Sequence, residues 1–284
     1  MRVLLKCDEP TMAMSLTHRV KPMKKLDDSQ VEAFDTEHVD DARWLTVKIG
    51  IDRAFPDGEF TFLDVGGGNG KFADRLLAEY PGSRGTVLDS SELLLSRNQP
   101  NQRKALLLDS VENLDQLNAR YDIIIVNWVL HHVVGDSYAV TRRNQLWALR
   151  ALAGLLTERG RISVFENVYD GLLIENLPGW LIYQLSANGA IRGITRRLGA
   201  NTAGVGVCFL SKKQWLSTMS DAGLEVFRYT EPDGWSWSVP PPWKICLHIR
   251  RRCVGHFWLR PRRNEPLTLG HPAGPMPEQR QDPR

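Results

Sequence analysis

Four glycines lie in the ten residues 61–70, which read Thr-Phe-Leu-Asp-Val-Gly-Gly-Gly-Asn-Gly. Glycine adopts positive φ angles cheaply and has no Cβ, so a ligand can approach the backbone of a turn built from Gly66, Gly68 and Gly70. Apolar residues before the turn favour a strand that runs through Asp64, and the residues from Phe72 onward have helical spacing. The segment predicts a strand, a glycine turn and a helix, with a binding crevice above the turn.

A second acidic residue, Asp89, ends the apolar segment 85–89, 19 residues after Gly70. A carboxylate at this place accepts hydrogen bonds from the two hydroxyls of a ribose, so the pair predicts a nucleoside-type ligand. The dinucleotide fingerprint G-x-G-x-x-G would require a glycine at position 71, where the chain has Lys71. An NAD-linked oxidoreductase is therefore a minor alternative.

Two adjacent histidines, His131 and His132, follow another apolar segment, and Glu166 ends the next one. A base helps a hydroxyl to react by accepting its proton, and the pKa of histidine lies close to neutral pH. We predict that one of the two histidines is the base and that Glu166 orients an acceptor. The alternatives are that His131 packs under its loop, that His132 caps a helix, and that Glu166 is a buried acid bonded to backbone amides.

The order of the apolar segments predicts the fold. Strands are expected at residues 61–64, 85–89, 104–109, 121–132, 161–166, 224–229 and 243–250, and a helix is expected at 138–156, stopping near Gly160. Such an alternation is typical of an α/β fold, here a Rossmann-like seven-stranded mostly parallel sheet whose last strand is antiparallel, with helices on both faces. Ligands of such sheets bind beyond the carboxyl ends of the strands, where Asp64, Asp89, Asp109 and Glu166 are expected.

The glycine turn D-x-G-x-G-x-G, residues 64–70, resembles motif I of the class I S-adenosylmethionine-dependent methyltransferases. With residues 80–89 and the segment Asn-Trp-Val-Leu-His-His at 127–132, the chain is most similar to the bacterial and plant small-molecule O-methyltransferases over about residues 40–250. The resemblance implies that S-adenosyl-L-methionine is the cofactor. The residues that it implies for cofactor binding are Asp64, Gly66, Gly67, Gly68, Gly70, Asp89, Ser90, Asp109, Ser110 and Asn127.

The same resemblance implies methyl transfer to a small organic acceptor, at oxygen rather than nitrogen, by in-line displacement without a metal. Two departures from the family pattern stand out. Only 63 residues precede Asp64, too few for the family's helical dimerisation domain, so the dimerisation domain is not expected and a homodimer is left open. Ala200 stands where the family has its usual catalytic histidine, which keeps a non-catalytic binding partner as an alternative.

Two stretches are candidates for acceptor recognition. Residues 167–210 exceed what the core fold needs and are expected to form an insertion of about one and a half helices on the acceptor side. Trp235 and Trp237 are expected at the rim of the acceptor pocket or as staples of their loop. By analogy with the family, Trp44 and residues near Phe34 are expected to close the pocket from the other side.

Composition and charge set the remaining expectations. We expect a flexible arm at residues 1–25, a single methyltransferase domain at 26–258 and a disordered basic, proline-rich tail at 259–284. The apolar runs are too short for a membrane span, and a cytoplasmic protein is the default. Seven basic residues and no acid lie in 244–263, which raises an RNA methyltransferase as an alternative, although a solvated edge strand is favoured and nucleic acid is not an expected partner.

Overall fold

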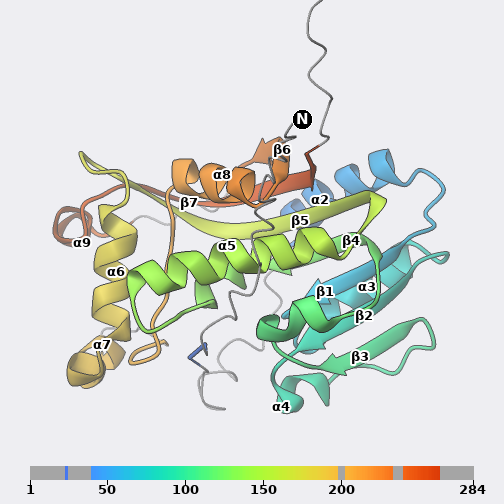
Figure 1. The fold of residues 1–284 in the computed structure, drawn as a ribbon, viewed down its shortest axis with the longest axis horizontal. Helices are drawn as coiled ribbons and strands as arrows, with labels where there is room; N and C mark the ends of the chain where they lie inside the picture. Colours follow the sequence, from blue (N-terminus) through green and yellow to red (C-terminus); the bar gives the residue numbers. More distant parts are fainter. Residues whose placement is uncertain (1–22, 25–39, 198–201, 233–238, 263–284) are drawn as a thin grey trace, which may run out of the picture.

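Seven strands form one sheet in the order β3-β2-β1-β4-β5-β7-β6 (Figure 1). The protein is described by a computed structural model for residues 23–24, 40–197, 202–232 and 239–262. All neighbours from β3 through β5 pair in parallel, whereas β7 is antiparallel to both β5 and β6. The predicted Rossmann-like sheet with an antiparallel last strand is confirmed. The strands are β1 (Thr61–Val65), β2 (Arg84–Asp89), β3 (Lys104–Leu108), β4 (Tyr121–Asn127), β5 (Leu156–Gly171), β6 (Leu224–Thr230) and β7 (Ile249–Pro261).

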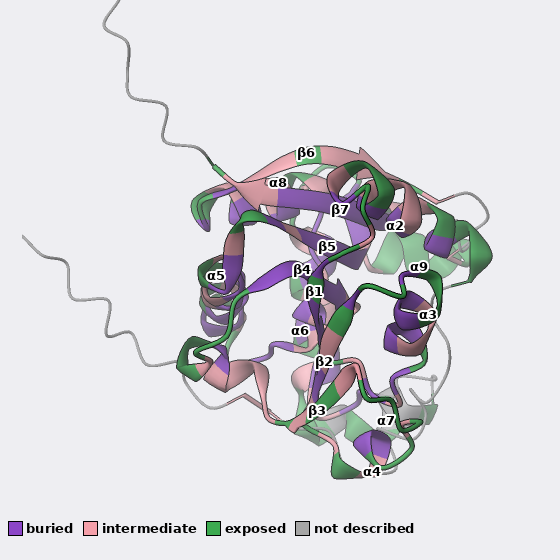
Figure 2. Cartoon of the chain, turned by 90° about the vertical axis from the view of Figure 1, so that its right-hand side faces the viewer, coloured by how far each residue is buried: buried purple, intermediate pink, exposed green. Residues whose placement is uncertain are grey.

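Helices cover both faces of the sheet and create two hydrophobic clusters. Leu149 of α5 and Trp215 of α8 pack on one face, while Ile51 of α2 and Leu76 of α3 pack on the other. Figure 2 shows the buried residues concentrated along the central strands between these layers. The described helices are α2 (Asp41–Ala54), α3 (Lys71–Glu79), α4 (Glu92–Leu95), α5 (Tyr138–Gly154), α6 (Leu177–Ala187), α7 (Arg192–Arg197), α8 (Lys212–Asp221) and α9 (Pro241–Cys246), with short 3₁₀ helices η1 (Val111–Gln116), η2 (Leu130–His132) and η3 (Gly189–Ile191).

The strand order places a topological switch between β1 and β4. The chain moves from β1 to β2 and β3 on one side, and then returns to pair β4 with the other side of β1. Ligands of open parallel sheets bind in the crevice at the carboxyl ends of the strands at such a switch. The glycine turn after β1 and the residues that end β2 and β4 all lie at this edge.

Several predicted boundaries are wrong. The strand expected at 243–250 is instead the short helix α9, which follows the run of prolines at 240–242, and β7 begins only at Ile249. A proline in the first turn of a helix has a suitable φ and no N–H to lose, which explains the helix. Because β7 continues to Pro261, the tail expected from residue 259 begins too early.

Other corrections concern β4, α5 and β5. Strand β4 ends at Asn127 rather than continuing to residue 132, and α5 ends at Gly154, before Gly160. Strand β5 has 16 residues and extends past both expected ends. Its carboxyl end reaches Gly171 because β7 continues to pair with it there, and its amino end begins at Leu156, which pairs with Tyr121 of β4. The first five residues of the expected insertion, 167–171, therefore belong to the sheet. The helices α6 and α7 that follow agree with the expected insertion of about one and a half helices.

Some expectations concern residues that lie outside the described part of the chain. These are the arm at 1–22, Phe34, Ala200, Trp235, Trp237 and the tail from residue 263. Among the helices that the structure describes, none is both long and apolar enough to cross a membrane.

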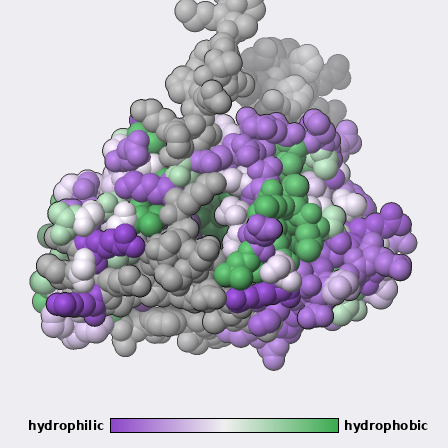
Figure 3. All heavy atoms as spheres, turned by 90° about the horizontal axis from the view of Figure 1, so that it is seen from below, coloured by the Kyte–Doolittle hydropathy of each residue, from purple (hydrophilic) through white to green (hydrophobic). Residues whose placement is uncertain are grey.

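Strand β3 forms one edge of the sheet and exposes two large apolar side chains, Leu106 and Leu108. Figure 3 shows a band of hydrophobic surface on the lower side of the molecule, the side on which β3 and α4 lie in Figure 1.

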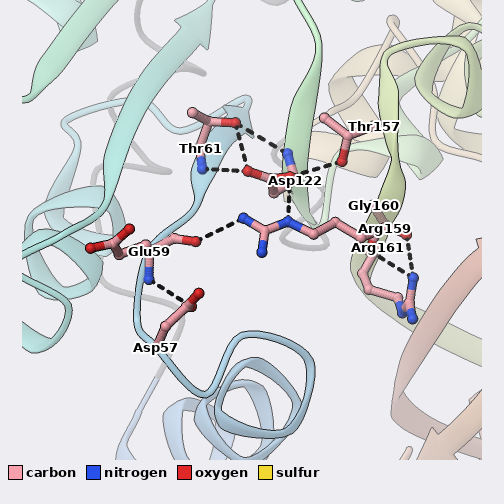
Figure 4. Close-up of polar contacts among 8 residues, drawn as sticks. All are labelled: Asp57, Glu59, Thr61, Asp122, Thr157, Arg159, Gly160 and Arg161. Carbon is pink, nitrogen blue, oxygen red and sulfur yellow. Dashed lines mark hydrogen bonds and ion pairs between the residues drawn. The ribbon is translucent and has the colours of Figure 1, made fainter.

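Asp122 lies at the amino end of β4, the opposite end of the strands from the glycine turn, and joins three parallel strands (Figure 4). Its Oδ2 accepts hydrogen bonds from the backbone N–H and the hydroxyl of Thr61, at 3.0 and 3.2 Å. Its Oδ1 accepts from Thr157 at 2.8 Å and from Arg159 at 3.1 Å. Burial alone would raise the pKa of Asp122, but these bonds outweigh it and hold the pKa below its usual value.

We predict that Asp122→Ala lowers the free energy of unfolding by about 1–2 kcal/mol, because it leaves the partly buried donors of β1 and β5 without their acceptor. A lowered folded-state pKa means that the contribution is complete above the pKa of the unfolded state, about 3.9, and is lost as the pH falls through the folded value. Urea unfolding at pH 7 and pH 3 measures this. A difference between wild type and variant that does not shrink at pH 3 would contradict the assignment.

Candidate functional site

The glycine turn after β1 has the left-handed conformations expected from its sequence. The φ angles of Gly66, Gly68 and Gly70 are 68°, 51° and 74°. A Cβ on Gly66 would lie 2.5 Å from Cγ2 of Val129, and one on Gly67 would lie 2.6 Å from Oδ2 of Asp64. The turn therefore requires glycine both for its backbone conformation and for its close packing.

Asp89, at the end of β2, lies directly against this turn. Its Oδ2 accepts a hydrogen bond from the backbone N–H of Gly68 at 2.9 Å, and its Oδ1 accepts from the N–H of Ser91 at 2.8 Å. Burial raises the pKa of Asp89, although the N–H groups of Ser91, Gly68 and Ser90 oppose the rise. The structure thus brings together the two features that the sequence analysis paired, and each carboxylate oxygen can accept a further hydrogen bond.

Two buried acceptor oxygens lie at the ends of the adjacent strands β1 and β4. Oδ2 of Asp64 and Oδ1 of Asn127 have no hydrogen-bond partner among the described residues. Burial raises the pKa of Asp64 to about 7, and the charge of Asp89 adds to the rise while Lys104 opposes it. Buried acceptors without donors are costly, so this pair suits a bound group that carries N–H donors.

The remaining predicted cofactor residues cap local structure at the ends of β2 and β3. Oδ1 of Asp109 accepts hydrogen bonds from the N–H of Ser110 and from Nδ2 of Asn113, both at 2.7 Å. The hydroxyl of Ser110 is the N-cap of η1 and accepts from Glu112 at 3.4 Å. The N–H of Asp109 donates to the carbonyl of Asp89 at 3.1 Å, so Asp89, Ser90, Asp109 and Ser110 are neighbours along one edge.

The three predicted catalytic residues also come together. Nδ1 of His131 lies 2.8 Å from Oε2 of Glu166, and the backbone N–H of His131 donates to Oε1 at 3.3 Å. The ring of His132 lies 4.1 Å from that of His131. Glu166 is thus both bonded to a backbone amide, as the structural alternative expected, and paired with a histidine.

Burial dominates the electrostatics of this cluster. It raises the pKa of Glu166 to about 8, against the opposing effects of His132 and of the N–H groups of His131, Leu130 and Asn167. Burial and the neighbouring His131 hold the pKa of His132 well below its usual value, so its imidazole is neutral at pH 7 and is a weaker base than an exposed histidine.

Sequence reasoning missed Gln145 of α5, whose side chain is hydrogen-bonded to the turn that carries the histidines. Its Nε2 donates to the carbonyls of Leu130 and Cys208, at 3.1 and 3.0 Å, and the N–H of Cys208 donates to the carbonyl of His131 at 2.9 Å. The next residue, Phe209, places its ring 4.8 Å from His131. A signal was available: Gln145 is a polar residue within the buried stripe of α5, together with Thr141, Ala148 and Leu152.

Two further positions bear on the site. Nδ2 of Asn98 donates to the carbonyl of Gly68 at 2.8 Å and so supports the turn. No sequence pattern predicted this role. Trp44, expected to close the acceptor pocket, is buried against Phe72 and belongs to the hydrophobic core. Among the described residues, no three His, Cys, Asp or Glu side chains gather as a candidate metal site.

Comparison with known proteins gives one family match and several similar folds. Residues 63–162 match the family model described as a methyltransferase domain. Among curated proteins no sequence matches the chain. LepI in complex with SAM superposes with a TM-score of 0.52 at 15% identity, over 82% of this chain and 51% of LepI, which shows a shared fold.

Two more solved structures are similar at lower scores. The calicheamicin biosynthesis methyltransferase CalO1, in its SAH-bound form, gives a TM-score of 0.48 and 18% identity over 82% of this chain and 58% of its own. Human N-acetylserotonin methyltransferase in complex with SAM gives 0.47 and 16%, over 78% and 54%. The chain thus spans between half and three fifths of the length of these structural neighbours.

We predict that Asp64→Asn changes the pH dependence of stability. The folded pKa of Asp64, about 7, lies above the unfolded value of about 3.9, so ionisation destabilises the wild-type protein as the pH rises between these values. Relative to wild type, the variant should gain about 1–3 kcal/mol between pH 5 and pH 8. Urea unfolding at both pH values, with the exposed Asp115→Asn as a control, tests this; parallel stability curves would show that Asp64 is ionised normally.

Proposed function

We propose that this chain is a class I S-adenosylmethionine-dependent methyltransferase that transfers a methyl group from S-adenosyl-L-methionine to a small organic acceptor, at oxygen and without a metal. The match of residues 63–162 to a methyltransferase domain supports this proposal. The observation that supports this most strongly is the hydrogen bond between Gly68 of the bare glycine turn and Asp89 at the next strand end. We also propose a domain that runs from about residue 26 to the end of β7, and a cytoplasmic role in secondary metabolism.

The residues present fit the proposed cofactor. The glycines of the turn carry no side chain that would hold a ligand away from the backbone, Asp89 offers carboxylate oxygens to a ribose, and the unpartnered acceptors of Asp64 and Asn127 suit an amino group. We assign Asp109 and Ser110, which neighbour Asp89 at the strand ends, to the adenine ring of the cofactor. When bound, S-adenosylmethionine supplies an activated methyl group and its own leaving group.

What remains for the protein is to align the acceptor, exclude water and accept a proton. The cluster of His131, His132 and Glu166 supports the last role, because His131 and Glu166 form a hydrogen-bonded pair of an imidazole and a carboxyl group at 2.8 Å, beside the neutral imidazole of His132. A base of this kind is needed for a hydroxyl acceptor, which favours transfer to oxygen. It also weighs against the alternative of a non-catalytic binding partner.

The basic segment gives little support to an RNA substrate. Arg251 pairs with Asp170 and Glu231, and Arg260 pairs with Glu225. Arg252 lies over the ring of Tyr169. These cations are engaged with groups of the fold, and a phosphate-binding array needs cations that face solvent. The NAD-linked alternative is likewise disfavoured, because Lys71 begins α3 where the fingerprint needs a glycine.

We predict that Asp89→Ala weakens the binding of S-adenosylhomocysteine by about 1–3 kcal/mol, because hydrogen bonds to a charged group are lost. Isothermal titration calorimetry with the wild type and with Asp115→Ala as a surface control measures this. No heat of binding in the folded wild-type protein would refute the proposed function, and unchanged affinity in Asp89→Ala would remove this residue from the site.

We predict that His131→Ala and His132→Ala, made separately, leave the affinity for S-adenosylhomocysteine unchanged and that at least one of them lowers turnover by about 10²-fold or more. Turnover is measured as S-adenosylhomocysteine formed with a panel of phenols and other hydroxyl compounds that the wild type methylates. If both variants keep full activity, neither histidine is the base.

A further inference from the structure

Large apolar side chains are exposed at one end of the molecule and take no part in the roles assigned so far. Figure 1 shows the loop after β5 and the helix α9 together at the left end of the ribbon. Leu173 of this loop is 92% exposed and Ile245 of α9 is 75% exposed, so these side chains have little contact with the rest of the fold. We call this surface the apolar tip, and its members are Leu172, Leu173, Ile174, Trp243 and Ile245.

A histidine in an unusual conformation joins the loop to α9. His248, between α9 and β7, has a φ of 56°, in the left-handed region that residues other than glycine rarely adopt. Its carbonyl accepts a hydrogen bond from the N–H of Leu172 at 3.0 Å. Its Nε2 accepts from the N–H groups of Leu173 and Ile174, at 2.8 and 3.0 Å. The surrounding bonds fix this strained residue, so the exposed loop is held in place by the fold.

The backbone of the loop has no free N–H group among these three residues. Each N–H of residues 172–174 is bonded to His248, and the carbonyl of Ile174 accepts from the N–H of Leu177 at 3.2 Å. An N–H without an acceptor is costly in an apolar medium, where no water replaces the missing partner. The loop can therefore enter such a medium without stranding a donor.

Helix α9 has the same property at its start. A helix leaves its first four N–H groups without intrahelical partners. Here residues 240–242 are prolines, which have no N–H, and the N–H of Trp243 donates to the carbonyl of Pro240 at 3.0 Å. The N–H of Lys244 donates to the same carbonyl at 3.1 Å. Both parts of the apolar tip thus combine exposed apolar side chains with backbone donors that are bonded or absent.

Basic side chains flank the apolar tip. Lys244 lies within α9 and is exposed. The side chain of Arg250 is 58% exposed, and its guanidinium lies 3.9 Å from Asp170, a long distance for an ion pair. Residues 239–252 contain no acid, and the loop contributes one, Glu175. Apolar and indole side chains next to cations are typical of surfaces that lie in the headgroup layer of anionic membranes.

The shape of the apolar tip also favours lipid over a protein partner. Protein interfaces bury their apolar anchors in well-packed pockets near the centre of the contact. The side chain of Leu173 is instead almost wholly exposed on a loop. A fluid bilayer admits such a side chain without a preformed pocket.

We propose that the apolar tip docks on the surface of an anionic lipid bilayer, with its apolar side chains among the headgroups and Lys244 and Arg250 beside the lipid phosphates. The contact is peripheral and needs no membrane-spanning helix. It does not depend on the proposed function. Because Glu166 lies on the same strand as Gly171, about 17 Å before it, docking holds the candidate site near the bilayer.

Co-sedimentation of the full chain with lipid vesicles tests the proposal. Vesicles of phosphatidylcholine alone are compared with vesicles of phosphatidylcholine and phosphatidylglycerol in equal parts. The apolar variant is Leu173→Ser with Ile245→Ser, and the charge variant is Lys244→Gln with Arg250→Gln. Thermal melting confirms folding, and Leu173→Ser alone replaces the apolar variant if the double substitution does not fold.

The matched control is Leu106→Ser with Leu108→Ser. These two leucines of β3 are 48% and 55% exposed, and four strands separate β3 from β7 in the sheet. The control removes the same kind of exposed apolar surface at a distance from the apolar tip.

We expect wild type to bind the mixed vesicles about 10-fold or more tightly than phosphatidylcholine vesicles, because cations near anionic lipid add to the affinity. The apolar variant should bind both kinds of vesicle about 10-fold or more weakly than wild type. The charge variant should lose the preference for mixed vesicles, and the control should bind as wild type does.

A wild type that binds neither kind of vesicle would overturn the proposal. So would an apolar variant that binds as wild type does, or a control that loses as much binding as the apolar variant. A charge variant that keeps the preference would remove Lys244 and Arg250 from the contact. If wild type sediments as a dimer without vesicles and the apolar variant as a monomer, the apolar tip is a contact between two copies and the proposal fails.

Discussion

The hydrogen bond from the N–H of Gly68 to the carboxylate of Asp89 is the constraint on which the site depends. It ties the loop between β1 and α3 to the end of the neighbouring strand, and Asn98 supports the same peptide through its carbonyl. The left-handed angles of the turn are compatible only with glycine at low cost, and the bond selects one arrangement among the many that glycine permits. The sheet behind it supplies rigidity, because every strand from β3 to β5 pairs in parallel with its neighbour.

A second property of this edge is its buried acidity. Burial raises the pKa values of Asp64, Asp89 and Glu166, and all three lie at or near the carboxyl ends of β1, β2 and β5. Carboxylates in such surroundings destabilise the folded chain unless positive charge is nearby. A sulfonium cofactor brings a positive charge, and its demethylated product does not. With pKa values of about 7 and about 8, Asp64 and Glu166 are partly or largely protonated at neutral pH, and a positive charge bound beside them would favour their ionised forms.

The sequence was informative where a local rule dictates structure, and less so where distant contacts decide. The glycine turn, the order of the strands and the position of Asp89 were predictable because backbone conformation and hydrophobic pattern depend on near neighbours. The extension of β5 to Gly171 and the start of β7 at Ile249 were not, because each strand continues only as long as the other pairs with it. Gln145 lies on α5, and its role arises from the loops that this helix packs against.

The link between His131 and Cys208 has a consequence for how this protein can diversify. The backbone of the histidine turn is bonded to the segment that closes the insertion, and Gln145 holds both. Phe209, which follows Cys208, forms a wall beside the histidine ring. Altering the Phe209 side chain to admit a differently shaped molecule would thus displace the proposed proton acceptor at the same time. Changes in acceptor range should come more easily from surfaces that do not share a backbone connection with the proposed base.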